Sequence, residues 1–139
     1  SRPQEPQVIL VDSSVLIDVI DEDPDWCGRS LAALDEWSRR GLVLINPIIY
    51  AEISPDFDHP AALDAVLEKV GIEYRDISRE GLFLAGKAHQ AYRRRGGART
   101  GVLPDFFIGA HAAVLGAPLL TRDVRRFQSY FPSVRLVTP

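Results

Sequence analysis

The sequence predicts a single-domain α/β fold, with a central and mostly parallel sheet of about five strands that is flanked by helices. Three observations support this prediction. A chain of 139 residues has the length of one ordinary domain. Its 46% hydrophobic content is sufficient for a buried core. Short apolar runs, typical of strands buried on both faces, alternate with segments of helical periodicity. Such alternation is typical of parallel sheets, in which functional sites lie at the carboxyl ends of the strands.

The first part of the chain contains two strand signals, each followed by helical segments. An apolar run at 8–11 ends at Asp12, and a second run occupies 42–45. Ser13 and Ser14 offer N-cap chemistry for the helix between them. Four helices are expected here. The first lies at 14–20, and the second contains Leu31, Leu34 and Trp37 and ends at Gly41. The other two lie at 47–53 and at 60–70.

The second part of the chain continues this alternation. The expected elements are a strand at 73–77, a helix at 78–95, a helix at 104–115, and strands at 119–121 and 134–137. The glycine-containing stretch at 96–101 is expected to form a flexible loop. Residues 1–139 are expected to form one domain, with 1–7 as a flexible N-terminal segment from which no function is inferred.

Composition excludes several classes of protein. With 25% charged and 46% hydrophobic residues, the chain is neither disordered nor collagen-like. Its single cysteine, Cys27, cannot form an internal disulfide. No apolar run approaches the ~18 residues that a membrane span needs, and the N-terminus lacks the layout of a signal peptide. We therefore expect a cytoplasmic protein with no membrane partner.

Charge is distributed unevenly along the chain, although the net charge is only −3. Residues 1–68 contain 4 Arg or Lys and 14 Asp or Glu, whereas residues 69–139 contain 12 and 5. This asymmetry predicts an acidic site beside a basic docking surface. Two solvated faces of different sign are the alternative interpretation.

Four acidic residues lie next to apolar segments, where a carboxylate is unexpected. Asp12 directly follows the first strand, and Asp123 follows the strand at 119–121 after one intervening residue. Glu52 lies on the apolar stripe of its short helix, and Asp105 is expected to face inward from the start of another. All four are expected at the same edge of the sheet.

These carboxylates predict a metal site. Converging carboxylates repel one another, and they are costly in partly apolar surroundings unless a cation neutralises them. Oxygen-only ligands favour hard ions such as Mg²⁺ or Mn²⁺, whereas zinc sites usually contain His or Cys. None of the three histidines has a paired metal-ligand spacing. Helix capping is an alternative explanation for Asp12 and Asp105, and Asp18 is a weaker candidate that better suits a surface or supporting position.

Four segments share their order and spacing with a known family. They are VDSSVLI at 11–17, PIIYAEI at 47–53, LPDFFIGAHA at 103–112 and LLTRDVRRF at 119–127. Together these segments resemble the PIN-domain family, and within it the VapC-type toxin ribonucleases of toxin–antitoxin pairs. The resemblance covers essentially the whole chain, and its most specific part is the third segment followed by Thr-Arg-Asp.

This resemblance implies roles for individual residues and for partners. The implied acidic quartet consists of Asp12, Glu52, Asp105 and Asp123. It would bind Mg²⁺ or Mn²⁺, with Asp12 and Asp105 as the direct ligands. Ser14 and Thr121 correspond to hydroxyl positions that orient a carboxylate or a water, with capping as the alternative. Some relatives carry Asn at the position of Ser14. The family also implies a homodimer and a cognate small antitoxin protein. Apolar residues of the first helices can supply that surface or simply pack in the core, namely Leu16, Ile17, Ile20, Leu31 and Trp37.

The expected reaction is metal-assisted hydrolysis of RNA phosphodiester bonds by water, which leaves 5′-phosphate and 3′-hydroxyl ends. Glu52 or Asp123 is the candidate general base, a role that the sequence does not separate from metal ligation. The basic stretch at 75–99 is expected to bind RNA, with Tyr92 stacking on a base, or else to be a solvated helix end. The expected phosphate contacts are Arg93, Arg94, Arg95 and Arg99.

Two other functions remain open. A non-catalytic PIN-like module would use the same acids for structure, or for binding RNA or a partner. A Mg²⁺-dependent phosphotransfer domain also places Asp at strand ends. A phosphatase of that kind needs a second Asp where this chain has Ser14, and a receiver needs a late Lys, whereas no Lys follows Lys87.

Overall fold

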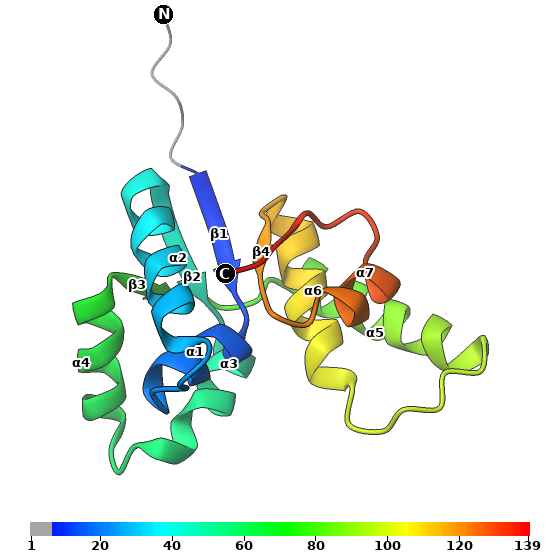
Figure 1. Cartoon of the computed structure of the whole chain (residues 1–139). Helices are drawn as coiled ribbons and strands as arrows, with labels where there is room; N and C mark the ends of the chain where they lie inside the picture. The colour runs from blue at the N-terminus through cyan, green and yellow to red at the C-terminus, as the bar shows by residue number, and fades with distance from the viewer. Residues whose placement is uncertain (1–6) are drawn as a thin grey trace, which may run out of the picture.

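The computed structural model describes residues 7–139, with the elements shown in Figure 1. The strands are β1 (Gln7–Val11), β2 (Gly41–Ile45), β3 (Ile72–Tyr74), β4 (Leu119–Leu120) and β5 (Leu136–Val137). The helices are α1 (Ser13–Ile20), α2 (Cys27–Arg40), α3 (Pro47–Ile53), α4 (Pro60–Val70), α5 (Arg79–Arg94), α6 (Leu103–Leu115) and α7 (Val124–Tyr130), with a 3₁₀ turn η1 at Ser54–Asp56. The expectation for 1–7 falls mainly on residues 1–6, which lie outside the described residues, whereas Gln7 begins β1.

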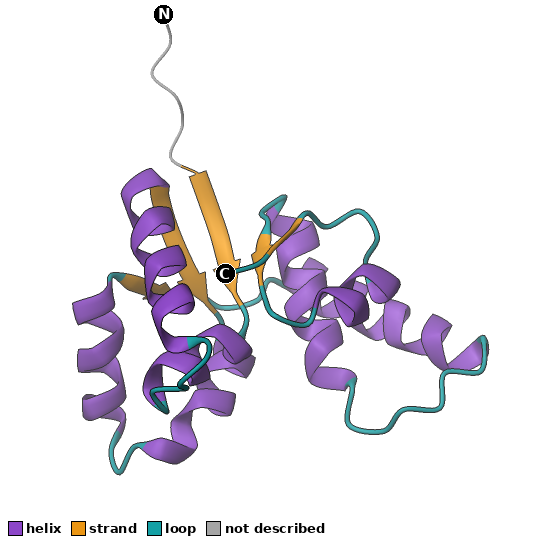
Figure 2. Cartoon of the chain, viewed as in Figure 1, coloured by secondary structure: helices purple, strands orange, loops and turns teal. Residues whose placement is uncertain are grey.

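The sheet is parallel throughout, in the order β3-β2-β1-β4-β5 (Figure 2). This arrangement confirms the predicted α/β fold. In the centre, Leu10 of β1 pairs with Leu44 of β2 and Leu119 of β4. The chain builds the sheet outward from β1 in one direction and then returns to its other side with β4. The junction of β1 and β4 is therefore the topological switch point, where α/β sheets place their sites.

The core forms where the central strands are buried on both faces. Leu10, Leu44, Leu119 and Leu120 have no exposed surface, as their apolar runs predict. Helices α1 to α4 gather around β2 and β3, while α5, α6 and α7 form a second group beside β4 and β5 (Figure 1).

Helix α7 is held against α6 by aromatic packing. The rings of Phe106 and Tyr130 stack with centroids 4.4 Å apart. Phe131 lies so close to Gly109 that a Cβ atom there would come within 2.2 Å of the Phe131 ring. This close approach requires glycine at position 109. The two helices thereby have a fixed relative position.

The structure differs from the predicted elements in three places. The strand expected at 73–77 ends at Tyr74, because the chain leaves the sheet after the Arg75 amide donates to the carbonyl of Ile45 at 2.9 Å. The strand expected at 134–137 is limited to Leu136–Val137. Helix α7 is not among the predicted elements, because only Phe127 and Tyr130 of its seven residues are buried and the apolar periodicity is weak.

Candidate functional site

Asp12 lies at the centre of the site, directly after β1. Its side chain is buried, with 3% of the residue exposed. Its Oδ2 accepts hydrogen bonds from the hydroxyls of Ser14 and Thr121, both at 2.8 Å. Thr121 Oγ1 also accepts from the amide of Asp123 at 2.9 Å. The two hydroxyl residues predicted beside the acids therefore both contact Asp12, and Thr121 links it to the backbone of Asp123.

Glu52 reaches the site from α3. Its Oε1 accepts a hydrogen bond from the Ser13 hydroxyl at 3.0 Å. Glu52 does not pack into the core as its position on the apolar stripe of the helix predicts, because the residue is exposed. Asn46, buried after β2, fixes the start of α3 by accepting from the Ile49 amide at 3.0 Å. Sequence reasoning considered Ser13 only as a helix cap and missed its hydrogen bond to Glu52.

Asp105 and Asp123 are joined by a residue that the sequence analysis did not single out. Asp105, in the first turn of α6, accepts a hydrogen bond at Oδ2 from Nη1 of Arg126 at 2.7 Å. The other nitrogen of that guanidinium, Nη2, lies 3.6 Å from Oδ2 of Asp123. Arg126 belongs to α7. The sequence signal for the contact with Asp123 is the spacing of three residues, which brings two side chains together only in a helix. Because α7 was not predicted, this signal could not be used.

The four acids form one electrostatic site. Burial raises the pKa of Asp12 most, and the negative charges of Asp123 and Asp105 raise it further, against the hydroxyl hydrogen bonds. Desolvation also raises the pKa of Glu52, with contributions from Asp12 and Asp105. The hydrogen bond to Asp105 raises the pKa of Arg126. Each of the four predicted acids therefore interacts electrostatically with at least one of the others.

The donor chemistry of the site suits a hard divalent cation, although the carboxylates do not converge on one point. Within residues 7–139, no three Asp, Glu, His or Cys side chains are placed to hold a single ion. Mg²⁺ needs fewer protein ligands, because it usually retains several waters and binds one or two carboxylates. Asp12 and Asp105, both largely buried and acidic, fit that requirement.

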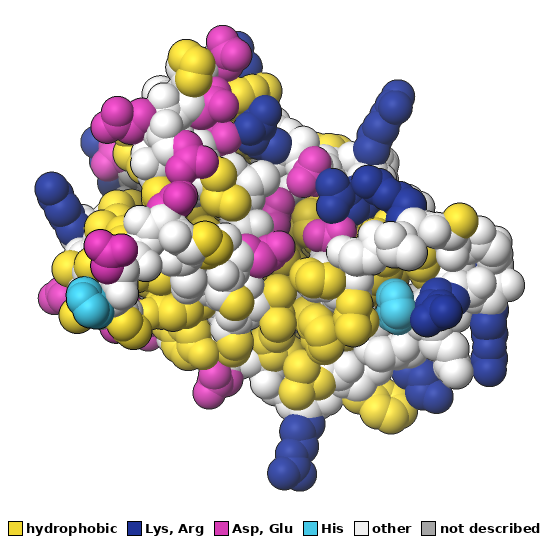
Figure 3. Space-filling view, turned by 90° about the horizontal axis from the view of Figure 1, so that it is seen from below, with side chains coloured by type: hydrophobic (Ala, Val, Ile, Leu, Met, Phe, Trp, Pro, Cys, Tyr) yellow, Lys and Arg dark blue, Asp and Glu magenta, His cyan; other side chains and the backbone are white. Residues whose placement is uncertain are grey.

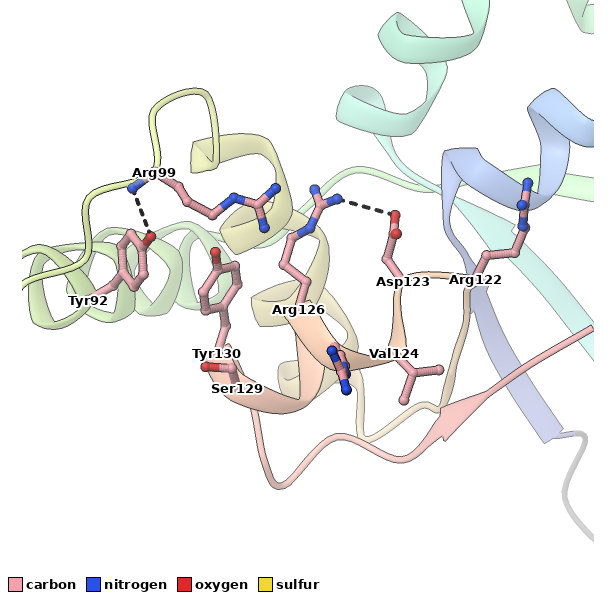
Figure 4. Close-up of a pocket in the computed structure, with 9 residues that line it drawn as sticks. Tyr92, Arg99, Arg122, Asp123, Val124, Arg126, Ser129 and Tyr130 are labelled. Atoms are coloured by element: carbon pink, nitrogen blue, oxygen red, sulfur yellow. Dashed lines mark hydrogen bonds and ion pairs between the residues drawn. The ribbon is translucent and has the colours of Figure 1, made fainter.

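A groove of about 620 Å³ opens beside Asp123 (Figure 4). It is lined by Tyr92, Arg99, Arg122, Asp123, Val124, Arg125, Arg126, Ser129 and Tyr130. Acidic side chains dominate one side of the molecule and basic ones the other in Figure 3. The groove itself combines Asp123 with four arginines, so a polyanion can approach this acid along basic side chains.

The predicted RNA-binding arginines are not all at this groove. Arg99 lines it, whereas Arg93 and Arg94 line a separate depression beside α5. The Arg95 guanidinium lies over the ring of Tyr92, 5.9 Å from its centroid. Tyr92 itself packs against Phe106 and Tyr130, and its hydroxyl accepts from the amide of Arg99 at 3.1 Å. Tyr92 therefore supports the groove wall from within the protein.

The sequence matches a known family over most of its length. The match covers residues 9–130, and its description is PIN domain. The chain belongs to the PIN domain family.

This PIN domain has the fold of several solved toxin–antitoxin proteins. VapBC2 from Rickettsia felis, solved with a DNA fragment from their promoter, superposes with a TM-score of 0.75 and 19% identity, over 96% of this chain and 99% of that one. DNA-bound VapBC from Salmonella typhimurium gives 0.71 and 20%, over 95% and 98%. A toxin–antitoxin complex from Klebsiella pneumoniae gives 0.68 and 22%, over 94% and 97%. A search of curated protein sequences finds no significant match. None of the helices within residues 7–139 is long and apolar enough to cross a bilayer.

Asp18 supports the site of this PIN domain from behind. It is buried, and it accepts hydrogen bonds from Arg122 Nη1 at 2.6 Å and from the Ser30 hydroxyl at 3.0 Å. The Arg122 guanidinium also lies over the Trp26 ring, 4.2 Å from its centroid. Arg122 stands between Thr121 and Asp123, so this anchor ties the loop after β4 to α1 and α2.

Proposed function

We propose that this PIN domain is a Mg²⁺- or Mn²⁺-dependent endoribonuclease that acts as the toxin of a toxin–antitoxin pair. The observation that carries the proposal is that four carboxylates from four separate segments lie at the switch point of the sheet, where the charges of Asp105 and Asp123 raise the pKa of Asp12 and those of Asp12 and Asp105 raise the pKa of Glu52. Such mutual repulsion is typical of a site that holds a cation. Family membership gives no support to the phosphotransfer alternative.

The hydrogen bonds of the site support a separate role for each of these acids. Both hydroxyls donate to Oδ2 of Asp12, so the carboxylate has a fixed orientation in which Oδ1 would remain to bind a cation. Asp105 would be the second ligand from α6. Bound Mg²⁺ would supply a water of lowered pKa and neutralise charge on the phosphate. Glu52 suits the general base, because its pKa is raised while the residue remains exposed to solvent.

RNA would enter along the groove beside Asp123. Arg99 and Arg125 line this groove and can contact phosphates, whereas Arg93 and Arg94 would extend the contact along α5. Neutralising Arg99 and Arg125 together is expected to flatten the salt dependence of RNA binding more than neutralising Arg93 and Arg94. An equal effect of the two pairs would contradict the groove as the main path.

A cognate antitoxin and a homodimer are further parts of this proposal. The support is the fold shared with solved toxin–antitoxin complexes. Among the apolar residues considered for a partner surface, Leu16 and Trp37 are buried, whereas Leu31 is 44% exposed. Light scattering with and without the small protein encoded beside this one tests both partners. A monomer that ignores that protein would contradict this part of the proposal.

The decisive experiment is 5′-end mapping of cellular RNA after incubation with purified protein and Mn²⁺ or Mg²⁺. Discrete cuts with 5′-phosphates are expected, and they should disappear with EDTA and with Asp105→Asn. Asp35→Asn, an exposed acid of α2 paired with Arg39, is the matched control and should cut normally. Cyclic-phosphate ends would contradict hydrolysis by water. No cuts by a folded, metal-binding protein would instead favour the non-catalytic module.

A further inference from the structure

A positively charged side chain of the protein lies at the acidic site. Within residues 7–139, Arg126 is the only basic side chain that forms an ion pair with any of the four carboxylates. Its Nη1 lies 2.7 Å from Oδ2 of Asp105. Its Nη2 lies 3.6 Å from Oδ2 of Asp123, the ion pair drawn in Figure 4. The positive charge therefore sits on Asp105, which is the expected ligand from α6.

The neighbouring arginines are placed differently. Arg122 binds the buried Asp18 and stacks over Trp26, so it has a structural partner away from the acids. Figure 4 shows Arg99 extending from its loop toward Arg126. Among the arginines of residues 7–139, only Arg126 bridges two acids, and 29% of its side chain is exposed.

The electrostatics of the site explain why this contact forms. Asp12 is stabilised by hydroxyl groups, whereas Asp105 receives a charged hydrogen bond, which is a stronger interaction. Arg126 also lowers the pKa of Glu52, against the effect of burial. One guanidinium thus offsets repulsion across the quartet.

We propose that Arg126 is a built-in competitor of the metal, which holds Asp105 in the metal-free protein and releases it when a divalent cation binds. The inference rests on the proposed metal site. The groove of about 620 Å³, which Arg126 lines, gives the released side chain room to move. There the guanidinium meets the phosphates of the substrate, so metal binding converts an inhibitory contact into a substrate contact. The protein then has low affinity for metal alone and gains affinity when a phosphate offers Arg126 a second partner.

The first test measures Mn²⁺ affinity of the full chain by calorimetry, without RNA. Arg126→Gln retains a hydrogen-bonding side chain but removes the charge, and it should bind Mn²⁺ about three- to tenfold more tightly. Arg126→Lys should lie between this variant and the wild type. Arg125→Gln removes a nearby groove charge without an ion pair to the acids, and its affinity should change less than about twofold.

The second test follows the guanidinium directly by NMR of arginine side chains. In metal-free protein the Arg126 signals should show restricted rotation, and saturating Mg²⁺ should restore fast rotation while Arg122 remains unchanged. Tighter binding by Arg126→Gln together with this release supports the inference. An Arg126 that remains restricted at saturating Mg²⁺, or a loss of affinity equal in Arg126→Gln and Arg125→Gln, would overturn it while leaving the metal site intact. If neither the wild type nor Arg126→Gln binds Mn²⁺, the inference and the proposed metal dependence both fail.

Discussion

Replacing Thr121 by valine removes one hydroxyl at the centre of the site while nearly preserving the shape of the side chain. Thr121 is fully buried, and its Oγ1 takes part in two hydrogen bonds, to Asp12 Oδ2 at 2.8 Å and from the Asp123 amide at 2.9 Å. A hydrogen bond to an ionised carboxylate contributes about 1.5–3 kcal/mol, and a neutral one about 1 kcal/mol. The free energy of unfolding at neutral pH should therefore fall by about 2–4 kcal/mol.

This loss should depend on pH in a defined direction. Burial raises the pKa of Asp12 in the folded protein above its ordinary 3.8, so this residue favours folding below that value and loses its contribution as pH rises through the folded-state pKa. The Thr121 hydroxyl opposes that shift. Its removal raises the pKa further, so Thr121→Val should cost more at pH 7 than at about pH 4.5.

Urea denaturation of Thr121→Val and Thr121→Ser at both pH values measures this effect. The serine variant keeps the hydroxyl and loses only a buried methyl group, which costs about 1 kcal/mol without a pH-dependent component. Equal losses for the two variants, or a valine penalty that is the same at both pH values, would refute the assigned role of the hydroxyl.

Three further predictions address the frame around the site. Gly109→Ala should lower the free energy of unfolding by about 1–3 kcal/mol in urea denaturation, because its methyl group meets the Phe131 ring, and an unchanged stability would show that the ring has room to move. Asp18→Asn weakens the anchor of Arg122 and should cost about 1–3 kcal/mol in thermal denaturation, whereas a change of a few tenths would mean that the ion pair contributes little. Mg²⁺ affinity measured by calorimetry should fall as pH decreases through the raised pKa of Asp12, because a ligand must be ionised, and an affinity that stays constant down to the pH at which the protein unfolds would exclude Asp12 as a ligand.

The sequence located the acids because each lies beside an apolar run whose direction is readable. Asp12 follows one buried strand, and in a parallel sheet the residues after neighbouring strands must meet. Arg126 could not be found in this way, because its contact with Asp105 spans 21 residues and depends on how α7 docks through Phe131. The orientation of Glu52 was mispredicted for a related reason. An apolar stripe on a seven-residue helix does not show whether a residue on it packs into the core or lies exposed at the edge of the sheet.

The switch-point topology also has a consequence for the synthesis of the protein on the ribosome. Asp12 is among the first residues of the described chain to be synthesised, yet its partner Thr121 is 109 positions later, and β4 must insert beside β1 before they meet. One edge of the central strand β1 therefore remains unpaired through most of translation. Chains interrupted before β4 contain three of the four acids but lack Thr121 and Asp123, so nascent and truncated products should be inert. The activity that we propose is thereby confined to polypeptides whose synthesis has passed residue 123.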